Sequence, residues 1–369
     1  MIRETSTCQG SHLPNRQIAQ LPRPIPHSRP WITAADVRAV GRVLRRGSLA
    51  QGAEVGALEA EVGARLGLPP GVAVNSGTAA LHLALLALGV GPGDEVVVPS
   101  YVCIAPVHAV EQVGATPRLA DVDPNSYNLD PGDVRRRCTR RTRAIIVPHL
   151  FGLPADLDAV LRLGVPVIED CAQAFGATYR DRPVGSFGTI SILSFYATKL
   201  LTTGEGGMLL SRDRRLLARA RDLRDYDERR RHAPRFNYKL TDFQAALGRS
   251  QLRRLPTMLS RRHALAARYR RGWAALPVRL PVPDGIRTHA YHRFVVSCPG
   301  TATKIARRLA AHGVVARPPV FRPIHLTLGL TGFPGAEQAY RHALSVPIYP
   351  TLTRAEAQVV IGALQAVFA

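Results

Sequence analysis

The sequence predicts an α/β protein in which a mostly parallel sheet lies between helices. Short apolar runs alternate with helical patterns between residues 72 and 211, and this alternation is typical of a parallel sheet covered on both faces. The 369 residues can bury a large core, and 46% of them are hydrophobic, so we expect one large domain and a smaller one. We predict an N-terminal tail over residues 1–28, a large domain over 29–255 and a smaller C-terminal α/β domain over 256–369.

Patterns typical of helices and of strands alternate along the chain. From Thr33 the apolar residues Val37, Val40 and Val43 recur at helical spacing, and Gly47 ends this helix. The segment 226–238 is polar and irregular, which predicts an exposed loop. We expect further helices at 57–66, 78–88, 104–112, 131–137, 155–163, 212–224, 241–253, 256–274 and 301–311 and from 353 onward, and strands at 72–75, 95–99, 118–122, 144–148, 165–169, 191–195, 207–211 and 291–298.

The chain carries a net charge of +22 at pH 7, a balance that permits nucleic-acid binding. Its arginine clusters at 135–137, 229–231 and 261–262 are spread over several predicted elements, and no zinc-finger, RRM or basic-zipper pattern lies beside them. We therefore expect no dedicated nucleic-acid role. An anionic small substrate, or a compositional preference for arginine over lysine, explains the charge equally well.

The cysteines and the hydropathy pattern indicate the cellular compartment in which the protein acts. The five cysteines are odd in number and lack paired metal-ligand spacing, which predicts reduced thiols, a cytoplasmic location and no metal site. No apolar run reaches membrane-spanning length, and the N-terminus is polar where a signal peptide needs an apolar core. We expect a protein without a membrane partner.

Lys199 is one of only three lysines, whereas 46 residues are arginines (49 − 3). It lies in a polar segment between the predicted strands 191–195 and 207–211, among hydroxyl groups and glycines. An amine can lose its proton and attack a carbonyl, which a guanidinium cannot do. A solvated surface lysine is the alternative when this residue is considered alone.

Three predicted strand ends carry polar groups suited to a ligand. Segment 75–78 (Asn-Ser-Gly-Thr) is a strand-to-helix turn whose backbone N–H groups and helix dipole would hold a phosphate. Asp170 and Gln173 follow the apolar run before them, at the edge where open α/β sheets bind ligands. Ser194 precedes Lys199, and TGEGG follows it. Simple helix capping is the alternative for the first two sites when each is taken alone.

Together, a phosphate cradle, a buried acid, an amide and an amine-bearing loop match the needs of pyridoxal phosphate (PLP). The lysine would form a Schiff base, and the aspartate would keep the pyridine nitrogen protonated so that the ring accepts electrons. A nicotinamide site is a weaker explanation, because no GxGxxG follows a strand.

The predicted large domain contains, in this order, the motifs NSGTAALHLAL, GPGDEVVVPS, VDPNSYNLD, VPHLFGLPAD, VIEDCAQAFGA, SFYATKLLTTGEGG and FNYKLTD. The motif LSVPIYP follows in the predicted small domain. With these motifs in this order, the chain from about residue 25 to its end resembles the DegT/DnrJ-type aminotransferases of sugar and cyclitol biosynthesis. These are PLP-dependent enzymes of fold type I. The resemblance implies a large PLP-binding domain and a smaller C-terminal domain.

The resemblance also implies roles for individual residues. Lys199 would carry the cofactor and move protons between the donor, cofactor and acceptor carbons. Asp170 would pair with the ring nitrogen and Gln173 with the phenolic oxygen. The phosphate would be held by Gly77, Thr78 and Ser194 and by Asn237 of the neighbouring subunit, which implies a homodimer.

The sequence departs from the family pattern at the face of the cofactor ring. Family members place an aromatic residue there, in the segment after PS, whereas this chain has Cys103. A thiol is small and polarisable and could lie on the ring face, or Tyr101 could compensate for the missing aromatic residue. A buried structural cysteine is the alternative.

A second departure lies in the predicted small domain. The family pattern His-Tyr-x-Pro-x-His is replaced by VFRPIH over residues 320–325, so only His325 keeps the pattern and Arg322 adds a charge. The substrate contacts therefore differ from those usual in the family. We place Tyr101, His149, Arg322 and His325 on the substrate side of the site.

The resulting expectation is a cytoplasmic aminotransferase. It would take an amino group from glutamate or glutamine and deliver it to a keto-sugar, nucleotide-linked in our interpretation, or to a keto-cyclitol, in a ping-pong reaction. Lys199 argues against the relatives that carry histidine there and dehydrate sugars. Two alternatives stay open: a PLP-dependent lyase or desulfurase that uses Cys103 or Cys171, and a non-catalytic regulator of the same fold that uses its basic surface.

Overall fold

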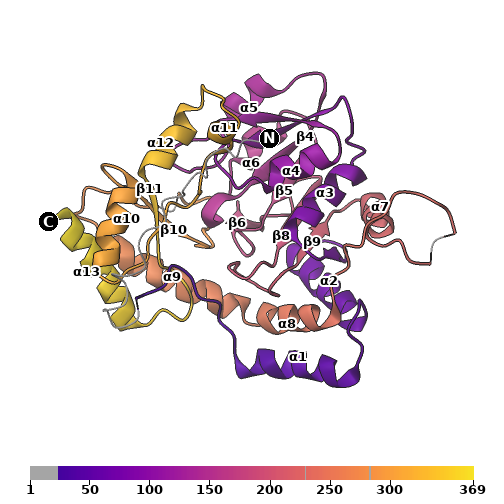
Figure 1. The fold of residues 1–369 in the computed structure, drawn as a ribbon, viewed down its shortest axis with the longest axis horizontal. Helices are drawn as coiled ribbons and strands as arrows, with labels where there is room; N and C mark the ends of the chain where they lie inside the picture. Colours follow the sequence, from indigo (N-terminus) through magenta and orange to yellow (C-terminus); the bar gives the residue numbers. More distant parts are fainter. Residues whose placement is uncertain (1–23, 229, 282–283) are drawn as a thin grey trace, which may run out of the picture.

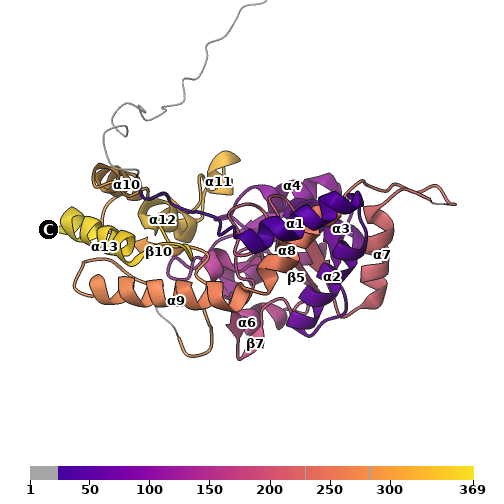
Figure 2. The ribbon, with the colours of Figure 1, turned by 90° about the horizontal axis from the view of Figure 1, so that it is seen from below.

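The computed structural model describes residues 24–228, 230–281 and 284–369. Figures 1 and 2 show a large domain built around a sheet and a smaller domain beside it, formed by the C-terminal part of the chain. Helix α9 (Leu255–Gly272) runs from the large domain along the small one. Within the described residues, no helix combines the length and the apolarity needed to cross a bilayer.

A seven-stranded sheet with the order β1-β9-β8-β5-β4-β2-β3 forms the centre of the large domain. Strand β9 runs antiparallel to its neighbours β1 and β8, and all other neighbouring strands are parallel. This topology confirms the predicted α/β fold with a mostly parallel sheet. Its strands are β1 (Val72–Val74), β2 (Glu95–Pro99), β3 (Thr116–Ala120), β4 (Thr142–Pro148), β5 (Val167–Asp170), β8 (Ile190–Ser194) and β9 (Gly207–Leu210).

Both faces of this sheet are buried because its strands are apolar and successive side chains point to opposite sides. In β2, Val96 and Val98 join one hydrophobic cluster and Val97 joins the other. The first cluster includes residues of α3, α4 and α7, and the second includes residues of α2, α5, α6 and α8. The helices of the large domain are α1 (Ala34–Arg46), α2 (Ala53–Leu66), α3 (Gly77–Ala87), α4 (Ala105–Gln112), α5 (Pro131–Arg137), the 3₁₀ helix η2 (Leu150–Gly152), α6 (Leu157–Leu161), α7 (Arg214–Arg224) and α8 (Asp242–Leu252).

The small domain has its own hydrophobic cluster. Tyr269 of α9 and Trp273, the residue that follows this helix, stack with their ring centroids 4.6 Å apart, and both rings pack against Phe294. These large buried aromatic side chains hold α9 on the two-stranded antiparallel sheet of this domain. The remaining elements are β10 (Phe294–Ser297), α10 (Ala302–Ala311), α11 (Ile324–Thr327), α12 (Pro334–His342), β11 (Ala343–Val346) and α13 (Arg354–Phe368).

The segment before α1 crosses the small domain before it reaches the large one (Figure 2). Ile25 is buried, and it pairs with Val314 through two backbone hydrogen bonds, Ile25 N to Gly313 O at 2.8 Å and Val315 N to Ile25 O at 3.0 Å. The predicted tail of residues 1–28 therefore needs a correction at its end, because residues 24–28 are held against the small domain. The rest of that predicted tail, residues 1–23, lies outside the described residues.

Some elements differ from the sequence prediction. Helix α2 begins at Ala53 rather than at residue 57, because a distant carboxylate extends its first turn: Asp242 Oδ1 accepts hydrogen bonds from Gly52 N at 2.9 Å and from Val55 N at 3.0 Å. Helix α12 was not predicted because its buried residues are small and give no clear apolar pattern. The other elements that were not predicted are too short to show a helical or strand periodicity. The missed elements are η2, β6 (Thr178–Tyr179), β7 (Arg182–Pro183), α11, α12 and β11.

Candidate active site

The turn from β1 into α3 packs directly on the end of β8. In the sheet, Gly207 of β9 lies between Val74 of β1 and Ser194 of β8. A Cβ atom at Gly77 would lie 2.9 Å from the Cβ of Ser194, and one at Gly207 would lie 2.4 Å from the carbonyl oxygen of Ser76. Both positions therefore require glycine, and the close packing brings the N-terminus of α3 against the end of β8.

This N-terminus is suited to an anion. Ser76 caps α3, because its Oγ accepts a hydrogen bond from Ala79 N at 3.0 Å. The N–H groups of Gly77 and Thr78 belong to the first turn, where no carbonyl inside the helix can accept from them. With the positive end of the helix dipole and the Ser194 hydroxyl beside them, they form a cradle that a phosphate would fill.

Asp170 ends β5, the strand next to β8, at the same edge of the sheet. Its Oδ1 accepts a hydrogen bond from Ala172 N at 3.0 Å, and among the described residues no cationic group lies within ion-pair distance. Burial raises the pKa of Asp170, although the Ala172 N–H and the positive charge of Lys199 oppose this shift. The carboxylate is thus free to pair with a cationic atom of a ligand.

Lys199 lies in the loop between β8 and β9. Two hydrogen bonds to the Phe195 carbonyl oxygen shape this loop, one from Thr203 N at 2.9 Å and one from Thr202 Oγ1 at 3.0 Å. Burial lowers the pKa of Lys199 below its ordinary value, while Asp170 and Cys103 oppose this effect. The amine therefore loses its proton more readily than a solvated lysine does.

The third member of this group is Cys103, which follows β2 and the buried Ser100. Burial raises the pKa of the Cys103 thiol, the negative charge of Asp170 adds to the shift, and Lys199 opposes it. Although protein surrounds Cys103, Asp170 and Lys199, each keeps accessible surface. The charges of these three groups act on one another's pKa values, so the groups lie near one another at this edge of the sheet.

Gln173 reaches the same region from the segment after β5. Its Oε1 accepts a hydrogen bond from Phe151 N at 3.0 Å, which fixes the orientation of the side-chain amide. The two N–H donors on Nε2 remain for an acceptor such as a phenolic oxygen. Gln173 is half-buried, as expected for a group that faces both protein and ligand.

The structure does not place Tyr101 on the substrate side of the site. Tyr101 is fully buried, its ring packs near Tyr127 and Phe151, and its hydroxyl donates to Ala339 O at 3.4 Å. It holds α12 on the large domain. The predicted roles of Tyr101 toward substrate and cofactor have no support in these contacts and stay predictions.

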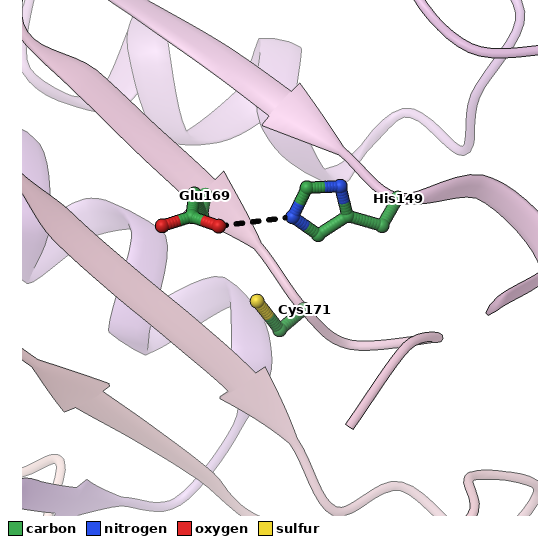
Figure 3. A group of neighbouring side chains, drawn as sticks. All are labelled: His149, Glu169 and Cys171. Carbon is green, nitrogen blue, oxygen red and sulfur yellow. Dashed lines mark hydrogen bonds and ion pairs between the residues drawn. The ribbon is translucent and has the colours of Figure 1, made fainter. Parts of the chain in front are cut away.

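His149 is also buried, within a group that Figure 3 shows at the ends of β4 and β5. Its Nε2 lies 3.2 Å from Glu169 Oε2, and its Nδ1 accepts a hydrogen bond from Ala155 N at 3.0 Å. Both ring nitrogens of His149 are thus engaged with protein groups, and its predicted substrate contact stays a prediction. The ligand atoms of His149, Glu169 and Cys171 lie within 4.8 Å of one another.

Arg322 and His325 lie apart from the cavity beside Lys199. His325 is fully buried, with its Nδ1 2.5 Å from Ser100 Oγ and its ring stacked on Phe333. Arg322 is exposed and donates to Leu326 O at 3.0 Å. His325 therefore fastens α11 to the end of β2, and the predicted substrate contacts of both residues stay predictions.

Asn237 lies next to the phosphate cradle of its own subunit through its backbone. The carbonyl oxygen of Asn237 accepts a hydrogen bond from Asn75 Nδ2 at 3.3 Å, and Asn75 N donates to Tyr238 O at 2.8 Å. The residue itself is exposed, so its side chain is accessible to another molecule. Its predicted contact with a neighbouring subunit stays a prediction.

Two cavity residues were not predicted from the sequence. His292 and Arg293 lie just before β10, and with Lys199 they line one pocket. Burial and the positive charges of Lys199 and Arg293 hold the pKa of His292 well below its usual range. The available signal was a pair of basic residues at the start of an apolar strand, but the sequence does not show that this strand begins at the cavity.

The chain matches the model of the DegT/DnrJ/EryC1/StrS aminotransferase family over residues 30–365. It is 39% identical to GDP-perosamine synthase of Caulobacter vibrioides, over 82% of this chain and 86% of the relative. It is also 39% identical to dTDP-3-amino-3,4,6-trideoxy-alpha-D-glucose transaminase of Streptomyces venezuelae, over 89% of this chain and 90% of the relative.

The fold has close counterparts among solved structures. Spr1654 of Streptococcus pneumoniae, described as a candidate sugar aminotransferase and solved in a PLP form, superposes with a TM-score of 0.88 at 27% identity. The match covers 93% of this chain and 98% of the other. The family match spans nearly the whole chain, and the predicted fold type I architecture is confirmed. The chain belongs to the DegT/DnrJ/EryC1/StrS aminotransferase family.

Proposed function

We propose that this protein uses PLP to transfer an amino group from glutamate or glutamine to a nucleotide-linked keto-sugar or to a keto-cyclitol. The observation that carries this proposal is the meeting of Lys199, Asp170 and the cradle of α3 at one edge of the sheet. Lys199 has a lowered pKa and Asp170 has no cationic partner among the described residues. Family membership supports the reaction class.

The described residues fit PLP. The cradle at Gly77, Thr78 and Ser194 would hold the phosphate, and the Gln173 amide would donate to the phenolic oxygen. Asp170 would hold a proton on the ring nitrogen, because a carboxylate that is largely removed from water and lacks a cationic partner gains most from a cation. When bound, PLP supplies an aldehyde and an electron-withdrawing ring. The thiol of Cys103 lies where it can contact the ring face.

In this proposal Lys199 has two tasks, and its lowered pKa serves both. A neutral Nζ would bond to the cofactor aldehyde with loss of water, and, once the amino group of the donor has replaced it there, it would accept a proton from the carbon that bears the transferred amino group. The lowered pKa gives Lys199 a larger neutral fraction than a solvated lysine has at the same pH. Because one cavity serves donor and acceptor in turn, we expect ping-pong kinetics.

For the acceptor, we favour a sugar attached to a nucleotide. Two relatives at 39% identity bear the names of enzymes of GDP- and dTDP-linked sugars, and the net charge of +22 attracts an anionic substrate. A panel of GDP-, dTDP- and UDP-linked keto-sugars and one keto-cyclitol, assayed with glutamate as donor, tests this choice. Amination of the cyclitol alone would contradict it.

We also propose that the protein acts in the cytoplasm as a homodimer with shared active sites. The exposed side chain of Asn237 beside the cradle supports a contribution from the partner subunit. The four described cysteines carry free thiols, in agreement with a reducing compartment.

The first half-reaction provides the decisive experiment. The PLP-loaded protein is mixed with glutamate in the absence of any acceptor, and the cofactor absorption and 2-oxoglutarate are followed together. We expect the absorption to change and about one equivalent of 2-oxoglutarate to form per subunit. Glutarate, which lacks the amino group, is the control and should cause neither change. An unchanged spectrum with glutamate and with glutamine would overturn the proposal.

A cysteine-dependent lyase is the second candidate, and one observation favours it: Cys103 lies near enough to Lys199 for the charge of the lysine to act on its pKa. Cys171 is less suited, because it is fully buried and burial raises its pKa well above the usual range. Both thiols are therefore held in the unreactive protonated form. Release of sulfide or alanine from cysteine, lost in a Cys103→Ala variant, would support the lyase over the aminotransferase.

A further inference from the structure

A cationic pocket extends from Lys199 toward the small domain. Its walls come from the N-terminal segment 27–31, the Lys199 loop, α9 and the residues around β10 and β11. Four of its lining side chains are lysine or arginine, two are histidine, and none of the described lining residues is acidic. The six basic residues are His27, Arg29, Lys199, Arg262, His292 and Arg293.

Arg293 is a cation of this pocket with few acceptors for its guanidinium among the described residues. Among the described residues its guanidinium has one hydrogen bond, from Nη1 to His27 Nε2 at 3.3 Å, and it forms no ion pair. Arg262 differs, because its Nη1 donates to three backbone carbonyl oxygens. Burial and the positive charge of Arg317 lower the pKa of Arg293. A guanidinium in such surroundings gains most from an anion that the protein does not provide.

The backbone of Phe151 connects Arg293 to the group that would hold the cofactor. Phe151 N donates to Gln173 Oε1 at 3.0 Å, and Phe151 O accepts from Arg293 N at 3.1 Å. Phe151 itself has a φ of 61°, a left-handed conformation that turns the chain sharply between these two contacts. Arg293 is therefore held in a set position relative to Gln173, and it shares its pocket with Lys199.

His27 orients the guanidinium without adding charge. Because an arginine nitrogen only donates, His27 Nε2 must accept the hydrogen bond from Arg293, and the same nitrogen lies 2.8 Å from Ser345 Oγ. Burial and the charges of Arg293 and Arg317 lower the pKa of His27 to about 3. The ring is neutral at physiological pH, so Arg293 carries the positive charge at this end of the pocket.

We propose that Arg293, oriented by His27, binds a carboxylate of the amino donor. The inference rests on the proposed aminotransferase function, and it names the residue that recognises one of its two substrates. An amino-acid donor carries its α-carboxylate on the carbon that bears the reacting amino group, and glutamate carries a second carboxylate on its side chain. A cation in the pocket of the reacting lysine fits either carboxylate. Planar guanidinium groups bind carboxylates through two parallel hydrogen bonds.

The test compares Arg293→Gln with Arg293→Lys and with the control Arg271→Gln. Arg271 is exposed, lies in the same domain and gives the same change in charge. In the PLP-loaded protein we expect Arg293→Gln to lower the second-order rate constant of the glutamate half-reaction by about 30-fold or more, as for loss of a buried charged hydrogen bond. Arg293→Lys should recover part of this loss, and Arg271→Gln should react like the wild type.

A binding measurement accompanies the kinetics. Calorimetric titration of the PLP-loaded proteins with glutarate should show binding to the wild type and to Arg271→Gln, and at least about tenfold weaker binding to Arg293→Gln. Retention of the cofactor absorption by Arg293→Gln shows that the variant is folded and loaded. Parallel reactions with glutamine locate the group: loss with both donors indicates the α-carboxylate, and loss with glutamate alone indicates the side-chain carboxylate.

Two outcomes would overturn the inference. Equal donor rates and equal glutarate affinity in Arg293→Gln and the wild type would show that Arg293 does not bind the donor. A raised KM for a nucleotide-linked acceptor, with the donor step unchanged, would assign Arg293 to the other substrate. Failure of the proposed function looks different, because the wild type itself would then not react with glutamate.

Discussion

Burial moves the pKa values of Asp170 and Lys199 in opposite directions, up for the carboxyl and down for the amine, while the attraction between the two charges opposes both shifts. If the two charges formed a close ion pair, their attraction would favour the charged form of both groups. No such ion pair forms here among the described residues, so a ligand can interact with each group separately. This makes Asp170 a partner for a cationic ring nitrogen and leaves Lys199 free to react.

The first prediction concerns the Asp170→Asn variant. An amide cannot hold the ring nitrogen protonated, so we expect the rate of the glutamate half-reaction to fall by at least about 100-fold while the cofactor remains bound. Asp181→Asn is the control, because Asp181 is exposed and its positive φ of 60° suits asparagine. Stopped-flow absorbance measures both variants. A rate within threefold of the wild type for Asp170→Asn would contradict the assigned role.

At the scale of single residues, the sequence supported some predictions and misled others. Asp170 and Ser194 follow apolar strands, and the ends of parallel strands meet at one edge, so their approach could be predicted. Tyr101 and His149 lie at similar strand ends, yet their side chains turn into the protein. Their orientation depends on partners such as Ala339, more than 200 residues away, which no local pattern shows.

At the scale of elements, α3 and β8 determine the shape of the cradle. Gly77→Ala would place a Cβ atom 2.9 Å from Ser194 Cβ, so we expect a loss of about 1–3 kcal/mol of unfolding free energy and weaker PLP binding. Gly56→Ala, in α2 with open space around the new methyl group, should instead stabilise the protein by about 0.5–1 kcal/mol. Denaturant unfolding and cofactor titration measure the two effects.

The double variant Gly77→Ala/Ser194→Gly separates packing from binding. Removal of the Ser194 side chain relieves the contact, so stability should recover, whereas PLP affinity should stay low because the Ser194 hydroxyl is lost as well. Recovery of full PLP affinity in the double variant would show that Ser194 does not contact the phosphate.

The segment before α1 makes the fold sensitive to acid. The pKa of His27 is lowered from 6.5 to about 3, so between these values the unfolded chain binds a proton that the folded chain does not. The unfolding free energy therefore falls as the pH falls from 6.5 to 3. His27 is partly exposed, and we expect its share to be about 2 kcal/mol after screening.

His27→Gln, which keeps a hydrogen-bond acceptor near Arg293, measures this share. Its unfolding free energy should depend less on pH across that window than that of the wild type. His232→Gln is a matched control on the exposed loop after α7, and it should leave the slope unchanged. Identical slopes in His27→Gln and the wild type would show that His27 is not buried in neutral form.

Regular elements were easier to predict than the contacts between them. The structure confirms helix α1 between its caps Thr33 and Gly47, but of the predicted apolar face only Val43 is buried, and Val37 is exposed. The pocket beside Lys199 depends on contacts such as that of His27 with Ser345, 318 residues apart. Because that contact joins the N-terminal segment to β11, an element that the prediction missed, the pocket could not be predicted.

At the scale of the whole molecule, the proposed homodimer shares its active sites. If one active site needs Lys199 from one subunit and Asn237 from its partner, the inactive variants Lys199→Ala and Asn237→Ala should regain activity when they are mixed and exchange subunits. Half of the dimers in an equal mixture are hybrids, and each hybrid has one intact site. The mixture should reach about one quarter of the wild-type activity. No gain over the separate variants would place both residues in the same subunit's site.

The bond between Lys199 and the cofactor tests the central claim most directly. The PLP-loaded protein is reduced with borohydride, digested, and analysed by mass spectrometry, with Lys199→Ala treated in parallel. We predict that the pyridoxyl group is found on the peptide that contains Lys199, and that the variant carries none. A label on Lys239 or Lys304, or a label that persists in Lys199→Ala, would contradict the account.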